Sequence, residues 1–85
     1  MVTELLQPMK KQVQQLEKRM QELEQQIDEI ETALAEPTIY QAENRVQMEG
    51  YSRKRAELGI ELSDTEENWL VKCEELELLA QEIPR

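Results

Sequence analysis

The residues from Met9 to Leu34 carry an unbroken pattern of apolar side chains, spaced alternately four and three positions apart. The pattern consists of Met9, Val13, Leu16, Met20, Leu23, Ile27, Ile30 and Leu34. Such spacing places the apolar side chains along one narrow stripe of an α-helix, at the a and d positions of a heptad repeat. The intervening residues are almost all Gln, Glu, Lys, Arg and Asp. A helix with so narrow a stripe needs a partner helix to cover it, so the sequence predicts a coiled coil.

A second, less regular heptad repeat later in the chain supplies this partner. Its positions are Met48, Tyr51, Arg55, Leu58, Leu62, Thr65, Trp69, Lys72, Leu76, Leu79 and Ile83. Trp69 is expected to point into the seam between the helices as an anchor, and Cys73 to be a small packed side chain beside it.

Pro37 separates the two repeats and disfavours helical geometry in the residue before it. The first helix is therefore expected to end near Ala35. In the following turn, Thr38 and Gln41 fit a capping box at the start of the next helix. Ile39 and Tyr40 are expected to cover the end of the apolar stripe.

Two helices joined by a short turn run antiparallel. The predicted fold class is all-α, an antiparallel two-helix coiled-coil hairpin. We expect a linker or lead-in over residues 1–8, followed by a hairpin over residues 9–85. Within it we expect a helix over about residues 9–35, a turn over 36–42 and a helix over about 43–83 that Pro84 ends. In an alternative, Ser63–Glu66 forms a capping box and begins a third helix. The heptad repeat passes through these residues without a phase shift, which favours one long second helix, bent or loosened near Gly59.

The composition excludes several classes of function. The chain has no His and one Cys, so it offers no Ser–His or Cys–His pair, no imidazole metal ligand and no internal disulfide. It has no glycine-rich phosphate-binding motif. We therefore expect a segment that is not an enzyme and holds no metal or cofactor. Apolar runs long enough for a membrane span or a secretory signal are absent from the sequence, which predicts a cytoplasmic location without membrane contact.

The chain is strongly acidic, with 19 acidic and 10 basic residues and a formal net charge of −9. Such a chain repels phosphate backbones as a whole, so a nucleic-acid contact would require a local basic patch. The candidate residues are Arg45, Arg53, Lys54 and Arg55 in the second half of the chain, and Lys10, Lys11, Lys18 and Arg19 in the first. In the alternative interpretation they form ion pairs along the helix, Glu49 with Arg53 and Glu57 with Arg53 or Lys54.

Two segments of the sequence resemble a known family. They are the turn Leu34-Ala35-Glu36-Pro37-Thr38-Ile39-Tyr40 and the later run Glu66-Glu67-Asn68-Trp69-Leu70, which Leu76 follows. Together with the two heptads they resemble the C-terminal coiled-coil domain of the ABC-F ATPases of the Uup type, over about Lys10 to Leu79. Glu36 stands where the family often has Asp. The resemblance implies a parent protein with two ATPase cassettes that use ATP and magnesium, without membrane spans, acting mostly on the ribosome in translation.

Two functions remain open from the resemblance and the residues together. One is accessory binding of DNA or ribosomal RNA that supports the parent ATPase, through the eight basic residues above. The other is a protein-interaction or structural coiled coil that docks on the parent cassettes, a ribosomal protein or itself, as a monomer or weak dimer. Its contacts would be apolar residues outside the heptads, such as Val46, Ile60, Leu70 and Val71. A chaperone-like hairpin with a grasping tip ranks last, because the tip offers little apolar surface.

Overall fold

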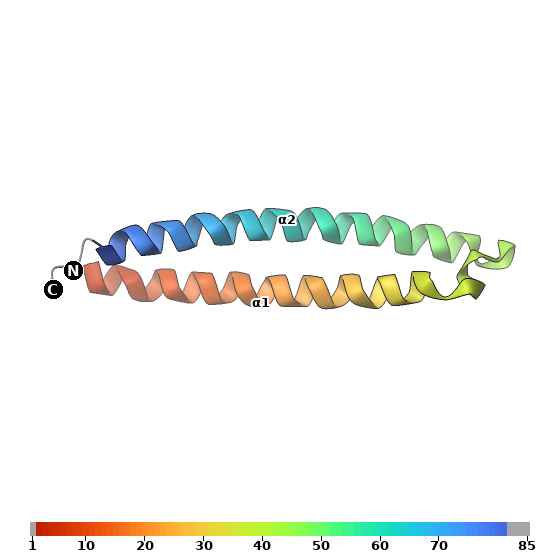
Figure 1. The fold of residues 1–85 in the computed structure, drawn as a ribbon, viewed down its shortest axis with the longest axis horizontal. Coiled ribbons are helices and arrows are strands. Elements are labelled where there is room, and N and C mark those ends of the chain that lie inside the picture. Colours follow the sequence, from red (N-terminus) through yellow and green to blue (C-terminus); the bar gives the residue numbers. More distant parts are fainter. Residues whose placement is uncertain (1, 82–85) are drawn as a thin grey trace.

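The computed structural model describes residues 2–81, with side chains from Leu6 onward. It contains the helix α1 (Val2–Ala35), two short 3-10 helices, η1 (Pro37–Tyr40) and η2 (Ala42–Asn44), and the helix α2 (Arg45–Gln81). The two long helices lie side by side and antiparallel in a rod of 65 × 14 × 14 Å (Figure 1). The predicted fold class, an all-α antiparallel two-helix coiled-coil hairpin, is confirmed.

The two heptad stripes form the seam of this hairpin. All eight stripe positions of α1 are buried or half-buried, and so are ten of the eleven in the second repeat. The eleventh, Ile83, lies outside the described residues, as does Pro84. Leu23, near the middle of α1, has 0% of its surface exposed, and Leu58 of α2 is almost as completely covered. The stripes of the two helices therefore cover each other, as the heptad spacing predicts.

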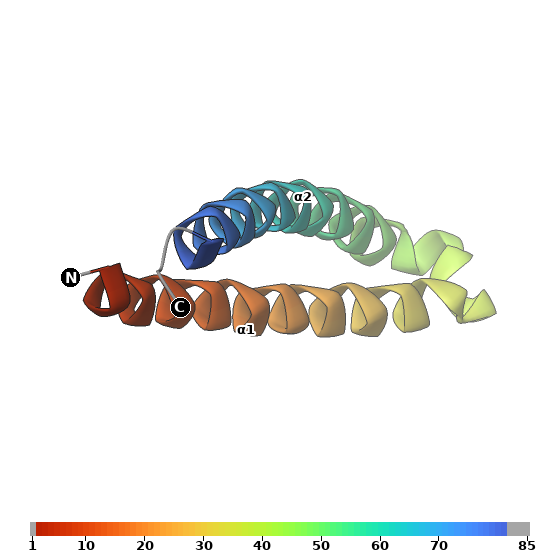
Figure 2. The ribbon, with the colours of Figure 1, turned by 60° about the vertical axis from the view of Figure 1, so that its left-hand side comes forward.

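The second helix is continuous and follows a curved path above the straighter α1 (Figure 2). The alternative, in which Ser63–Glu66 begins a third helix, is wrong. Thr65 lies buried in the seam, and its Oγ1 donates a hydrogen bond to the Glu61 carbonyl oxygen at 2.7 Å. This bond to the preceding turn satisfies the hydroxyl without breaking the helix, and such bonds are common where helices bend.

The expected lead-in over residues 1–8 is instead helical from Val2 onward, so α1 begins seven residues earlier than expected. Pro8 lies inside the helix, where its missing N–H and its ring cost about 3 kcal/mol or more. Leu6 is buried one heptad before the first residue of the predicted a positions. Covering a leucine side chain stabilises by about 1.5–3 kcal/mol, which offsets much of the proline cost. The seam therefore extends past the proline.

The turn differs from the expected capping box. Pro37 takes the first position of η1, so Thr38 is already in 3-10 geometry and cannot serve as an extended cap residue. The Thr38 carbonyl oxygen instead accepts hydrogen bonds from the Gln41 backbone N–H at 3.2 Å and from Asn44 Nδ2 at 2.8 Å. These bonds hold the two 3-10 helices together, and α2 begins at Arg45, two residues later than expected.

Ile39 and Tyr40 have different roles in this turn. Ile39 is buried and covers the end of the seam, as expected. Tyr40 is 61% exposed, so its ring does not cover the seam. Its hydroxyl donates to the Leu34 carbonyl oxygen at 2.6 Å. That carbonyl belongs to the last turn of α1 and has no partner within the helix, so Tyr40 caps the helix end.

Replacing Leu23 by Ala is expected to lower the free energy of unfolding by about 2–4 kcal/mol, because a cavity opens at the best-covered point of a thin seam. Urea unfolding followed by far-UV circular dichroism measures the loss. The matched control is Gln25→Ala, an exposed position on the same helix, which should change the free energy by less than about 0.5 kcal/mol. A similar loss of unfolding free energy in both variants would contradict the central role of Leu23 in the seam.

Candidate functional site

Arg55, one of the predicted nucleic-acid contacts, lies at a seam position of α2 and reaches across to α1. Its Nε and Nη2 both donate to Glu31 Oε1, at 3.0 and 2.8 Å. Gly59 leaves room for the guanidinium, since a Cβ at this position would lie 3.3 Å from Arg55 Nη1. The side chain therefore connects the two helices near the tip of the hairpin.

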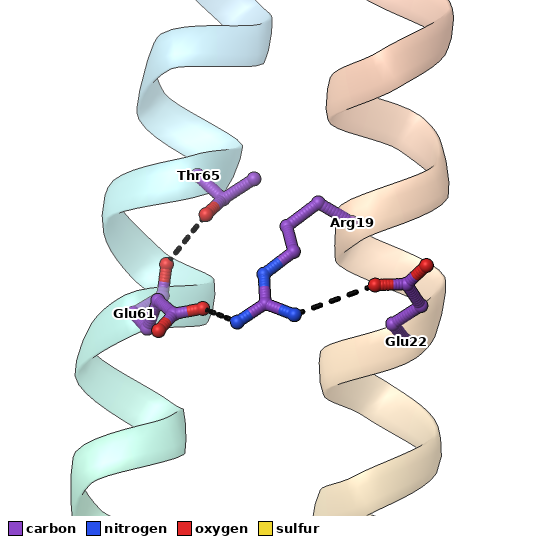
Figure 3. A network of polar contacts seen from close by, with 4 residues as sticks. All are labelled: Arg19, Glu22, Glu61 and Thr65. Carbon is purple, nitrogen blue, oxygen red and sulfur yellow. Dashed lines mark hydrogen bonds and ion pairs between the residues drawn. The ribbon is translucent and has the colours of Figure 1, made fainter.

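Arg19 forms a second bridge between the helices, closer to their free ends. Its Nη2 donates to the Glu61 carboxylate of α2, and its Nη1 donates to Glu22 Oε2 at 3.3 Å (Figure 3). The hydrogen bond to Glu61 is the main cause that raises the pKa of Arg19 above its usual value. Thr65 donates to the backbone carbonyl of the same Glu61. Glu61 therefore accepts one hydrogen bond from α1 through its carboxylate and another from within α2 through its carbonyl oxygen. The Arg19 guanidinium is thus paired with two glutamates of the hairpin itself.

The prediction of ion pairs along α2 is wrong about which residues pair. Glu49 lies four residues from both Arg45 and Arg53, and its Oε1 accepts from Arg45 Nε at 3.2 Å. Among the described residues, Arg53 and Lys54 form no ion pair, either with Glu49 or with Glu57. Both are exposed. Of the four cations predicted on α2, two are therefore paired with glutamates and two extend into solvent.

The remaining candidates lie on α1. Lys10, Lys11 and Lys18 are exposed and form no ion pair with the side chains described between residues 6 and 81. Because α2 runs antiparallel, Arg53 and Lys54 lie near the turn, about fourteen residues along the rod from Lys18. At 1.5 Å per residue this is a separation of about 20 Å. The structure therefore places the two predicted groups of cations apart, with no common basic patch.

The charges of the two helices are complementary toward the two ends of the hairpin. Residues 6–20 carry four basic and one acidic side chain, whereas residues 21–35 carry five acidic and none basic. On the second helix, residues 45–55 carry four basic and one acidic, and residues 57–81 carry eight acidic and one basic. In the antiparallel arrangement residues 6–20 lie beside the acidic second half of α2, and residues 45–55 lie beside the end of α1 that carries Glu31, whereas the middle parts of both helices are acidic (Figure 1). The two bridges between the helices join these opposite segments.

Apolar side chains that the seam does not cover gather on α2. The four exposed residues predicted outside the heptads are confirmed as exposed, namely Val46, Ile60, Leu70 and Val71. The structure adds Leu78, whose position seven residues after Val71 was the signal available in the sequence. None of the described α1 side chains is a large exposed apolar residue. The exposed apolar surface thus belongs to α2 and, through Tyr40, to the turn.

Trp69 and Cys73 lie at the border of the seam. Trp69 is half-buried and shares a hollow with Met20 and Leu70, in agreement with its predicted role as an anchor. Its indole nitrogen is covered and has no hydrogen-bond partner within the described part of the chain. Cys73 is a free, half-buried thiol, in keeping with a packed position beside the seam.

Among the side chains described from Leu6 to Gln81, no three Cys, Asp or Glu are grouped so that they could hold a metal ion. No helix within residues 2–81 is long and apolar enough to cross a membrane. The described surface therefore consists of charged and apolar side chains distributed along a rod.

The family model of the ABC transporter C-terminal domain matches residues 6–71. The match covers most of the hairpin, and the chain belongs to this family. It is a non-catalytic domain of ABC proteins. Searches of the curated proteins and of the solved structures gave no significant match. The resemblance seen in the sequence is thereby confirmed for the ABC C-terminal domain, and the ABC-F subfamily stays a prediction.

Reversing the charge at Arg55 with Arg55→Glu is expected to destabilise the hairpin, because Glu31 then faces a second carboxylate. Adding Glu31→Arg should restore most of the loss, with a coupling of about 0.5–1 kcal/mol that shrinks at high salt. Thermal unfolding of the four proteins of the cycle measures this coupling. Arg53→Glu is the matched control, since Arg53 is exposed and contacts no carboxylate of α1 in the described structure. The Arg55–Glu31 bridge would be contradicted if Glu31→Arg restored Arg55→Glu and Arg53→Glu to the same extent. It would also be contradicted if Glu31→Arg did not restore Arg55→Glu at all.

Proposed function

We propose that this hairpin is the C-terminal arm of an ABC-F-type ATP-binding protein and acts by docking on protein, namely on the ATP-binding cassettes of its parent. The observation that supports this is the one-sided distribution of exposed apolar side chains, which lie on α2 and not on the described surface of α1. Apolar side chains gathered on one side of a small domain commonly mark protein contacts. In this proposal ATP and magnesium belong to the parent cassettes, and the hairpin supplies only a surface.

The position of these residues supports the cassettes as the partner. Leu70, Val71 and Leu78 lie in the second half of α2, toward the end of the rod at which α1 begins and α2 ends (Figure 1). In a C-terminal domain the cassettes precede the hairpin, so they are joined to it at this end. A tethered partner meets the surface at an effective concentration in the millimolar range, and a contact of modest area then suffices.

The test is to mix the 85-residue chain with the cassettes of its parent from which the hairpin has been removed. Sedimentation velocity and isothermal titration calorimetry should show a saturable complex, with a Kd of about 1 mM or tighter because tethering supplies the rest of the affinity. ATP turnover by the cassettes, with and without the added hairpin, shows whether docking affects the parent activity. No complex at about 1 mM chain would overturn the proposal.

A second candidate function is accessory binding of DNA or ribosomal RNA. Its supporting observation is that Lys10, Lys11 and Lys18 are exposed on one segment of α1 without ion pairs to other described residues. Lysines in such a position contact phosphates without reading sequence. Arg53 and Lys54, at the other end of the rod, would form a separate contact.

For this candidate, binding of duplex DNA, single-stranded DNA and a structured RNA should weaken strongly between about 50 and 200 mM salt. Fluorescence anisotropy of the labelled nucleic acids measures it. Lys10→Glu/Lys11→Glu should abolish most of the binding, and the charge-matched control Arg53→Glu/Lys54→Glu should retain most of it. Failure of the wild-type chain to bind at the lower salt would remove this candidate.

A further inference from the structure

We infer that the outward side of the second half of α2 is the docking surface, and that its partner is a basic amphipathic helix of another protein segment. This outer face is defined by Leu70, Val71 and Leu78 together with Glu67 and Glu74. The inference rests on the proposed docking function and gives it a location and a partner chemistry.

The outer face follows from the geometry of α2. Trp69, Leu76 and Leu79 are half-buried against α1, so residues near the opposite side of the helix point into solvent. With about 100° of rotation per residue, Glu67, Glu74 and Leu78 fall close together on that opposite side. Leu70 and Val71 flank them on the two sides.

The apolar members of this face are well exposed for large side chains. The exposed fraction is 52% for Leu70, 47% for Val71 and 61% for Leu78. Eight residues separate the first from the last, a rise of about 12 Å along the helix. Two to three turns of a partner helix would therefore cover all three side chains.

The electrostatics of the same segment restrict what can bind. Between Glu57 and Gln81 there are eight carboxylates and one lysine, and that lysine lies 3.6 Å from the Glu75 carboxylate. Phosphate backbones and anionic lipid surfaces are repelled by such a field. An amphipathic helix with Lys or Arg beside its apolar stripe matches both the leucines and the glutamates.

A second copy of this chain fits the outer face less well. The basic segment of α1 carries Lys10, Lys11 and Lys18, but its described side chains include no large exposed apolar residue to cover the leucines. Two outer faces placed together would bring acidic segments into contact, which is unfavourable. The other basic segment, residues 45–55, exposes one large apolar side chain, Val46, so a different helix meets the apolar and charge requirements more fully than a second copy.

The test uses a synthetic peptide of about five helical turns, roughly 18 residues, with leucines on one stripe and lysines elsewhere. Two further peptides separate the contributions: one replaces each lysine by glutamate, and the other replaces each leucine by serine. Fluorescence anisotropy of the labelled peptides measures the affinity for the 85-residue chain. The emission of Trp69, the one tryptophan of the chain, which shares a hollow with Leu70, reports contact at the face. We expect the basic amphipathic peptide to bind at least about tenfold more tightly than either of the others.

Paired variants locate the contact. Leu70→Ser/Val71→Ser/Leu78→Ser should weaken peptide binding by about tenfold or more, since three apolar side chains lose their contacts. The control is Val46→Ser/Ile60→Ser, which removes two exposed apolar residues elsewhere on the same helix and should leave the affinity unchanged. Glu67→Gln/Glu74→Gln should weaken binding and reduce its salt dependence, whereas Glu24→Gln/Glu29→Gln on α1 should not. All of these positions are exposed, and circular dichroism verifies that the variants fold.

The outcomes separate this inference from the proposed function. If the parent cassettes bind the triple-serine variant as tightly as the wild-type chain, docking stands and the outer face is the wrong surface. If the wild-type chain binds the basic peptide through this face but binds no cassette, the surface stands and the proposed partner is wrong. Equal losses in the variants and their controls, or concentration-dependent dimerisation that the triple-serine change abolishes, would overturn the inference.

Discussion

The burial of one narrow apolar seam is the interaction on which this molecule depends. Neither helix has a second face with which to build a core, and Leu23 is fully covered only because the stripe of α2 lies against it. The rod is 14 Å thick, so every residue is within one side chain of solvent. This has two consequences. Polar groups at seam positions, such as Arg55 and Thr65, can reach a partner or a backbone carbonyl, and any residue outside the seam is available to the surroundings.

Charge favours the antiparallel direction in which the two helices pair. The apolar stripes alone would tolerate a parallel or shifted pairing, since such contacts are not directional. The basic first half of α1 lies beside the acidic second half of α2, and the reverse holds near the turn. Arg19 and Arg55 connect these segments through Glu61 and Glu31. A parallel pairing would place the two basic segments together and the two acidic segments together, so these exposed ion pairs contribute mainly to the direction of pairing, each adding only a little stability.

The heptads were sufficient to predict the hairpin, its turn near Pro37 and the covered positions of both stripes. The limits of the first helix were not predictable in the same way, because Pro8 signals a helix start whereas the burial of Leu6 depends on a partner helix being present. The roles of Thr38 and Tyr40 depend on whether the turn is extended or 3-10, which sequence spacing does not fix. The partners of the arginines required the register between the helices, and register is a tertiary property. Arg45 and Arg53 are equally distant from Glu49 along the chain, so no spacing rule selects between them.

The two helices of the hairpin therefore differ in what they leave for function. The described outer surface of α1 is amides and charges, and its sides carry Arg19 and Glu31, which bind α2. The outward side of α2 is needed for neither the seam nor the bridges, yet it carries leucines, a valine and carboxylates. Exposed leucine and valine side chains contribute nothing to a solvated helix that lysine or glutamine would not supply, and they favour association. Since the fold does not require these side chains, their presence on one face is most simply explained by a partner that covers them.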